Sequence, residues 1–337
     1  MMRQTTRQSM RQTLGVLSFA MGFSATAVAQ TPAAGAGAAF PVKPIELIVH
    51  TGPGGGSDIF TRVVADIIAK DKLLPVTTII QNKAGGGGAL AQNYVVGKRG
   101  DPYTVYAMVA SLMVAIPIRS GTDTGLDKFV PLALMGFDIN CIAVRADSPY
   151  KTVKDLVDAA RANPKAVTIS MGSVGSASHY LPFQLEKMTG VKFNLVSMKS
   201  GAEAVTTMLG GHVQATTEQL AEMTQYIEAG KIRVLAVASG KRLPGAPDLP
   251  TLKEQGYALH VGAGRGFMAP AGVPREAAAT LESAFEKAYK TPAWRDYMRR
   301  NFYEDVYMSG AELGRHMTEI KPDMERFIRE LGLANKP

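Results

Sequence analysis

The amino-acid sequence predicts an α/β fold in which two lobes enclose a cleft. Three observations support this prediction. Short apolar runs of strand length alternate with helical segments from residue 45 to residue 217, and two glycine-rich loops each join such a run to a helix. The length of 337 residues also favours two lobes over one core. In parallel α/β sheets, ligands bind beyond the C-terminal ends of the strands, so we expect a ligand between the two loops.

The N-terminus has the pattern of a secretory signal peptide. Three arginines and no acidic residue stand in the first eleven positions, an apolar stretch follows at residues 14–27, and an Ala-x-Ala cleavage site ends at Ala29. The apolar stretch is too short to span a bilayer. We expect a signal peptide over residues 1–29, cleaved after Ala29, and a flexible tail rich in alanine and glycine over residues 30–40.

Composition excludes several other classes of protein. Loss of the three N-terminal arginines lowers the formal net charge from +8 to +5, which suits an anionic ligand but is too dispersed for nucleic-acid binding. Cys141 is the only cysteine, so no internal disulfide can form, and its apolar neighbours predict a buried side chain. The five histidines lack metal-binding spacing, so we expect no metal site.

The segment at residues 45–68 gives the clearest indication of a binding site. An apolar strand at residues 45–49 leads into a turn with four glycines between positions 52 and 56, and Ser57 or Asp58 can cap the helix that follows. Such a helix start attracts anions through its free N–H groups and its dipole. Neither the P-loop nor the dinucleotide-binding pattern fits this loop. An ordinary strand-to-helix turn explains the segment equally well.

The chain then repeats strands and helices. A second loop, rich in glycine and serine, is expected at residues 171–179, and Gly190 is expected to end the helix after it. Thr152 and Asp155 predict a capped helix start. The expected strands are residues 76–80, 103–109, 140–144, 167–170, 195–198 and 213–217, and the expected helices are residues 89–96, 152–162, 180–189 and 202–209.

Short motifs distributed over the mature chain resemble those of one family in both spelling and order. They are Pro41-Val42-Lys43-Pro44-Ile45, Gly54-Gly55-Gly56-Ser57-Asp58, Asn82-Lys83-Ala84-Gly85-Gly86, Tyr103-Thr104, Gly175-Ser176-Ala177-Ser178-His179, Gly210-Gly211-His212-Val213, Ala229-Gly230-Lys231-Ile232-Arg233, Leu249-Pro250-Thr251 and Ala269-Pro270-Ala271-Gly272-Val273-Pro274. The chain thereby resembles Bug-type extracytoplasmic solute receptors, the periplasmic binding proteins of tripartite tricarboxylate transporters.

The resemblance implies a type II periplasmic-binding-protein fold with two α/β lobes joined by crossing strands. One lobe is expected from residues 41–140 and 241–337, and the other from residues 141–240. The resemblance also implies a periplasmic receptor, expected to be a monomer, that carries a small carboxylate to the membrane subunits of the transporter. No catalytic residue, cofactor or metal is expected, and the ligand contacts are often made through ordered water.

The residues expected to bind the ligand come mainly from the two loops. They are Thr51, Gly52, Gly54, Gly55, Gly56, Ser57, Asp58, Ser111, Ser173, Gly175, Ser176, His179, Gly201, Ala202, Glu218 and Arg265. At Asp58 a helix cap is the favoured alternative, because a carboxylate repels an anionic ligand. At His179 a structural role and a binding role are equally supported.

Several positions depart from the family's pattern and bear on the identity of the ligand. Thr51 stands where a bulky aromatic residue is common, Arg265 stands between two glycines near a usual aromatic pair, and Gln214 and Glu218 replace the usual acidic pair. These changes predict a roomier cleft with one additional cation. The leading hypothesis is an aromatic dicarboxylate such as terephthalate, and the alternative is an aliphatic acid such as citrate. Arg265 either contacts a second carboxylate or supports its own loop.

The sequence also bears on two other classes of protein. The sequence Gly172-Ser173-Val174-Gly175-Ser176 does not match the Gly-x-Ser-x-Gly motif of hydrolases, and His179 lies too close to Ser176 in sequence for the usual triad. We therefore expect no hydrolase activity. A subunit that presents its ligand to a histidine kinase would use the same fold, and the sequence does not separate this role from transport.

Overall fold

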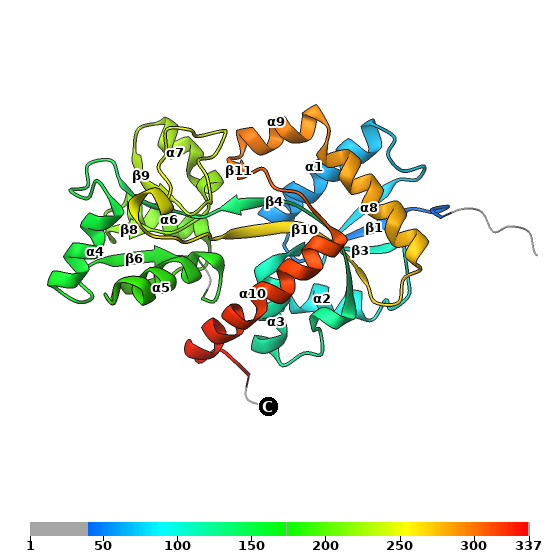
Figure 1. Ribbon diagram of the computed structural model, residues 1–337, viewed down its shortest axis with the longest axis horizontal. Coiled ribbons are helices and arrows are strands. Elements are labelled where there is room, and N and C mark those ends of the chain that lie inside the picture. Colours follow the sequence, from blue (N-terminus) through cyan, green and yellow to red (C-terminus); the bar gives the residue numbers. More distant parts are fainter. Residues whose placement is uncertain (1–39, 173, 336–337) are drawn as a thin grey trace, which may run out of the picture. The chain divides into compact units, whose positions relative to one another are not determined.

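The computed structural model describes residues 40–172 and 174–335 of the chain. The predicted signal peptide, residues 30–39 of the predicted tail and Ser173 lie outside the described residues. Two β-sheets with covering helices make up the described part, as the sequence predicts (Figure 1). Both sheets are mixed, because strands β4, β5, β9 and β10 add antiparallel pairs to the expected parallel ones. None of the helices described is long and apolar enough to cross a membrane.

The first sheet has seven strands in the order β11-β4-β10-β3-β1-β2, with β12 also paired to β4. Strand β1 pairs in parallel with β2 and β3, whereas β10 runs antiparallel to β3 and β4. The strands are β1 (Ile45–Val49), β2 (Thr78–Asn82), β3 (Thr104–Val109), β4 (Phe129–Ile139), β10 (Gly262–Pro270), β11 (Tyr303–Glu304) and β12 (Met308–Ser309). The helices of this half are α1 (Gly56–Lys70), α2 (Ala89–Val96), α3 (Ala110–Ser120), α8 (Arg275–Tyr289), α9 (Pro292–Arg300) and α10 (Gly310–Glu330).

The second sheet has five strands in the order β7-β6-β8-β5-β9. These are β5 (Cys141–Arg145), β6 (Thr168–Met171), β7 (Asn194–Ser197), β8 (Ala215–Thr216) and β9 (Ile232–Val237). The α-helices between them are α4 (Val153–Ala162), α5 (Ala177–Thr189), α6 (Gly201–Leu209) and α7 (Thr224–Glu228). Short 3-10 turns lie at η1 (Gly86–Gly88), η2 (Leu126–Lys128), η3 (Leu220–Met223) and η4 (Lys253–Gln255).

The chain crosses between the sheets at two adjacent places. It leaves the first sheet at the end of β4 and enters β5 after Asn140, and it returns through Val261 into β10 (Figure 1). The backbone N–H of Asn140 donates to Val261 over 3.1 Å, so the two crossings are hydrogen-bonded to each other. Strands β4 and β10 approach so closely that a Cβ at Gly266 would collide with the carbonyl of Ala133. Glycine is therefore required at that position.

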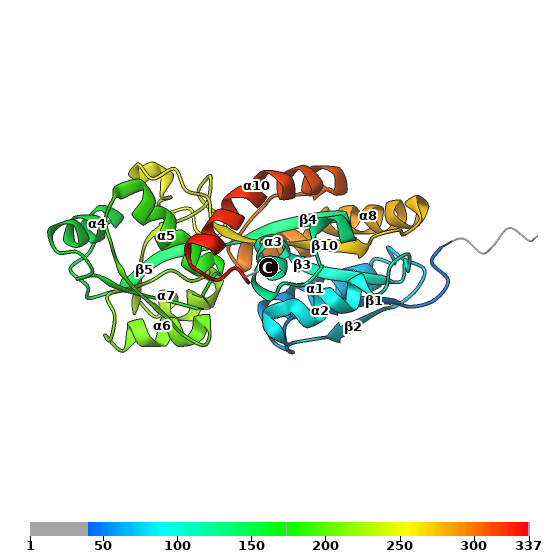
Figure 2. The same cartoon turned by 90° about the horizontal axis from the view of Figure 1, so that it is seen from below.

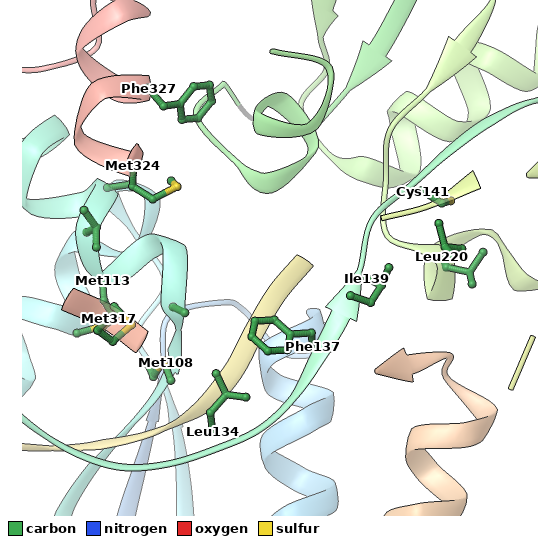
Figure 3. Close-up of a cluster of buried hydrophobic side chains, with 14 of the residues drawn as sticks. Met108, Met113, Leu134, Phe137, Ile139, Cys141, Leu220, Met317, Met324 and Phe327 are labelled. Carbon is green, nitrogen blue, oxygen red and sulfur yellow. The ribbon is translucent and has the colours of Figure 1, made fainter. Parts of the chain in front are cut away.

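One hydrophobic cluster extends from the first sheet into the second (Figure 3). Figure 3 shows Phe137, Ile139 and Cys141 following the crossing strand, with Leu220 beside Cys141. Cys141 is fully buried and unpaired, as predicted. Helix α10 belongs to the same cluster through Phe327. The ring centroid of Phe327 lies 5.0 Å from the ring centroid of Tyr180 on α5. Figure 2 shows α8 and α10 on one side of β4 and β10 and α2 on the other.

Most expected elements are present, and the differences have local causes. The helix at residues 89–96, the capping box of Thr152 and Asp155, and the left-handed C-cap at Gly190 are confirmed. The expected cap of the first helix by Ser57 or Asp58 is wrong. Helix α1 begins at Gly56, so Gly55 is the N-cap and Asp58 is already in the first turn. The strand expected at residues 213–217 is reduced to β8, and the strand expected at residues 76–80 starts at Thr78.

Phe267 tests how much the packing of the first sheet contributes to stability. Its fully buried ring stacks on the ring of Phe285, with 4.2 Å between the ring centroids. The centroid of the Phe60 ring lies 5.7 Å away. Phe267→Ala should lower the free energy of unfolding by about 3–5 kcal/mol, because it removes buried apolar area and leaves a cavity. Urea denaturation measures this loss. Ile79→Ala, at a side chain that is 46% exposed, is the control and should cost less than about 1 kcal/mol. Equal losses in the two variants would contradict this account of the core.

Candidate functional site

A cavity of about 200 Å³ lies where loops from both sheets meet. The first turns of three helices contribute to its wall. Gly56 and Ser57 start α1, Ser111 is the second residue of α3, and Ala177 starts α5 after its N-cap Ser176. The remaining lining residues are His50, Thr51, Val109, Leu112, Gln219, Glu222, Ala263 and Arg265. Since N–H groups at helix starts carry partial positive charge, this wall suits an anion.

Polar atoms that lack partners are concentrated at this cavity. Seven buried side-chain N or O atoms among the described residues have no hydrogen-bond partner. Four of them belong to residues of the cavity wall, namely His50 Nδ1, Thr51 Oγ1, Ser176 Oγ and Arg265 Nε. Because buried polar groups are normally satisfied, such a concentration indicates a place where a polar ligand or water binds.

The first loop is held in shape by Asp58. Its carboxylate accepts hydrogen bonds of 2.9 Å from the backbone N–H of Gly54, from both Nε and Nη2 of Arg62, and from Asn82. The Arg62 guanidinium and the Asn82 amide lower the pKa of Asp58 to about 2, against the opposing effect of burial. Asp58 is therefore an ionised support of the loop, and it is not part of the cavity wall.

The second loop is held in the same way by Glu218. This buried carboxylate accepts hydrogen bonds from the backbone N–H of Gly172 and, over 2.7 Å, from the hydroxyl of Ser178. Burial raises the pKa of Glu218. His179 also braces this loop, because its Nδ1 accepts from the N–H of Gly175 over 3.2 Å, and burial lowers the pKa of the imidazole to about 4. Neither side chain belongs to the cavity wall.

Arg265 lies on β10 at the base of the cavity and is only 8% exposed. Its guanidinium donates to Asp138 on β4 over 2.7 Å and to the hydroxyl of Ser57 over 2.9 Å. Asp138 is 6% exposed, so the two charges form a buried ion pair. Arg265 thus joins two strands to the start of α1, and its positive charge is largely neutralised by Asp138.

A negatively charged group, Glu222, lies on the cavity wall contributed by η3. The Glu222 carboxylate packs against Gly201, the first residue of α6. The Glu218 carboxylate packs against the same glycine. Glu222 is an exposed residue. Partial burial of its carboxylate is the largest cause that raises the pKa of Glu222 to about 7, and the charges of Glu218 and Asp138 add to the rise. On the same wall, burial and the charge of Arg265 lower the pKa of His50 to about 4, so His50 is neutral at pH 7.

The structure brings some of the predicted site residues to the cavity and leaves others behind it. On the wall are Thr51, Gly56, Ser57, Ser111, Ser176 and Arg265. Away from it are Gly52, Gly54, Gly55, Asp58, Gly175, His179, Gly201, Ala202 and Glu218, while Ser173 lies outside the described residues. Sequence reasoning missed His50, Val109, Leu112, Ala177, Gln219, Glu222 and Ala263. Only the spacing of Glu222, four residues after Glu218, offered a signal.

The acidic and histidine side chains of the described residues do not gather into a metal site. No group of three or more such side chains could hold a metal ion there. Two α/β sheets joined by crossing strands, with a cavity between loops of both, have the architecture of a solute-binding protein.

Comparisons with known proteins identify the family. A family model described as the tripartite tricarboxylate transporter family receptor matches residues 60–333. A Cupriavidus necator protein described as "UPF0065 protein in gbd 5'region" is 32% identical over 315 residues, covering 92% of this chain and 94% of that protein. A solved TctC solute binding protein from Polaromonas is 33% identical, with a TM-score of 0.75, covering 86% and 99% of the two chains. An R. palustris protein solved with adipate is 25% identical, with a TM-score of 0.76, covering 88% and 99%.

The chain therefore belongs to the tripartite tricarboxylate transporter receptor family, as its sequence predicts. Members of this family are periplasmic solute-binding receptors and not enzymes.

The buried Arg265–Asp138 pair provides a direct test of the architecture at this site. Arg265→Met leaves the Asp138 carboxylate buried and unpaired, so the free energy of unfolding should fall by about 3–5 kcal/mol. Adding Asp138→Asn should recover part of this loss, because the uncompensated charge is gone. Urea denaturation of the single and double variants measures both effects.

The exposed pair of Arg242 and Glu254 is the matched control, with side chains that are 47% and 45% exposed. Arg242→Met should cost less than about 1 kcal/mol. If Arg265→Met costs no more than Arg242→Met, the buried pair does not hold the site together.

Proposed function

We propose that this receptor captures a small carboxylate in the cavity between its two sheets and delivers it to the membrane subunits of a tripartite transporter. The observation that supports this most strongly is the concentration of unpartnered polar atoms on a wall built from three helix starts. Thr51 and Ser176 supply hydroxyl donors, and Arg265 Nε supplies a buried N–H donor. A carboxylate accepts such bonds with both oxygens, and these charge-assisted bonds are stronger than neutral ones.

Capture between the sheets also implies a conformational cycle. A ligand that touches α1 and α3 of the first half and α5 of the second half binds best when the halves approach each other, so it favours a closed form. The lobes are proposed to be residues 41–140 with 241–337, and residues 141–240. We further propose a monomer, exported to the periplasm with cleavage after Ala29.

The carboxylate itself is identified only as a class. An adipate-bound relative from R. palustris supports a carboxylate ligand for this chain. An aromatic dicarboxylate such as terephthalate remains the hypothesis drawn from Thr51, and a citrate-like aliphatic acid remains its alternative. The part of the aromatic hypothesis that relied on a free Arg265 loses support, because Asp138 already pairs with that guanidinium. Arg265 Nε lacks a partner among the described residues and is available to a ligand.

Removing single hydroxyl donors tests the proposed site. Thermal-shift screening of aromatic and aliphatic acids selects a ligand, and calorimetry measures its affinity. Thr51→Val and Ser176→Ala should each weaken binding by about five- to thirtyfold, because each removes one hydrogen bond to a charged group, worth roughly 1–2 kcal/mol.

Thr280→Val on the exposed face of α8 removes a similar hydroxyl far from the cavity and should leave affinity unchanged. Unaltered affinity in both cavity variants would show that the ligand binds elsewhere.

A further inference from the structure

We propose that Glu222 makes this receptor selective for carboxylates that also carry a positively charged group, the class of amino carboxylates, over ligands with two negative charges. The inference rests on the proposed carboxylate site and specifies the class of ligand that the site accepts.

The first argument is the charge of the cavity wall. Glu222 and Arg265 are its charged residues, since His50 is neutral at pH 7. Arg265 is paired with Asp138, whereas Glu222 makes no ion pair with any residue that the structure describes. When Glu222 is ionised, the wall therefore presents one uncompensated charge, and that charge is negative. A second carboxylate on the ligand would be repelled by it, and an ammonium group would be attracted.

The second argument is that this negative group shares the cavity with a separate set of anion-binding groups. Arg265, a lining residue of the cavity, is more than nine-tenths buried, and its Nε lacks a partner among the described residues. Together with the starts of α1, α3 and α5, this donor marks where a carboxylate binds. Glu222 comes from a different element, η3, which follows β8. The cavity thus offers donors for an anion and, from another element, an acceptor for a cation.

The third argument concerns the charges that surround Glu222. Its carboxylate faces Glu218 and Asp138, and of the nearby charged groups only Arg265 favours ionisation. Burial, together with the charges of Glu218 and Asp138, raises the pKa of Glu222 to about 7. A ligand ammonium beside Glu222 would supply the missing positive charge and lower that pKa again. Binding and ionisation of Glu222 would then reinforce each other.

A second cavity of about 400 Å³ provides room for the body of such a ligand. It shares Ser111 and Ala177 with the first cavity, so the two adjoin at the starts of α3 and α5. Apolar and aromatic side chains line it, including Phe137, Tyr180, Ile320 and Met324. Its other side chains include the acids Glu319 and Asp323 and the histidines His260 and His316. No lysine or arginine is among its lining residues in the described part of the chain. An apolar side chain therefore fits this space better than a second carboxylate.

Matched pairs of ligands test the inference by calorimetry. L-phenylalanine and 3-phenylpropanoate differ only in the ammonium group, and L-norleucine is compared with hexanoate and with adipate, which carries a second carboxylate. Each amino acid should bind at least tenfold more tightly than the matched acid that lacks the ammonium group. Glu222→Gln should remove this preference and should strengthen adipate binding. Glu228→Gln, at an exposed acid on α7, is the matched control and should change neither.

The pH dependence gives a second readout that a merely structural role would not produce. Between pH 5.5 and 8.5 the affinity for L-phenylalanine should rise, because Glu222 loses its proton and attracts the ammonium more strongly. The rise should be absent in Glu222→Gln, and His50 should not contribute because it stays neutral in this range.

Contradictory results are distinguishable. If adipate binds wild-type protein more tightly than either amino acid, or if Glu222→Gln leaves the preference unchanged, the inference is wrong while the proposed carboxylate receptor stands. If neither amino acids nor any carboxylate of the wider screen binds, the proposed function fails and the inference fails with it.

Discussion

The buried pair of Arg265 and Asp138 is the interaction on which the site depends. The two residues lie on β10 and β4, the strands that cross between the sheets, and Arg265 also bonds Ser57 at the start of α1. Two charges removed from water are costly unless their geometry is good, so the pair fixes the relative positions of these three elements. Because Asp138 neutralises the guanidinium, attraction of an anion falls mainly to helix starts and hydroxyl groups. A site of this kind binds by oriented dipoles more than by net charge.

Carboxylates that are not part of the cavity wall also hold both loops in shape. Asp58 accepts a hydrogen bond from the backbone N–H of Gly54 in the first loop, and Glu218 accepts one from the backbone N–H of Gly172 in the second. These N–H groups are therefore not available to a ligand. The N–H of Gly55 is likewise bonded within its loop, to the carbonyl of Gly52. These contacts explain why many loop residues are absent from the cavity wall. They set the backbone so that the next residues along, at the helix starts, face the cavity.

The sequence alone predicts the fold and roughly half of the wall, and the remainder has a physical explanation. Glycine turns, capping residues and apolar runs act locally, so the first loop and Ser176 could be located from their neighbours. Arg265 was identified as a candidate, but its partner lies 127 positions away, and that pairing depends on the register of β10 with β4. Glu222 lies in a single 3-10 turn without a motif. It reaches the cavity only because Gly201 leaves space for its carboxylate. Such proximity arises from tertiary packing, which no local pattern encodes.

A crystal structure of the full mature chain with a carboxylate selected by thermal-shift screening is the most direct measurement of the central claim. The account predicts that one carboxylate group of the ligand lies within hydrogen-bonding distance, directly or through one water, of Thr51, Ser111 and Ser176, with Arg265 still paired to Asp138. A carboxylate bound only in the apolar cavity beneath α10, or an Arg265 that leaves Asp138 to pair with the ligand, would contradict it.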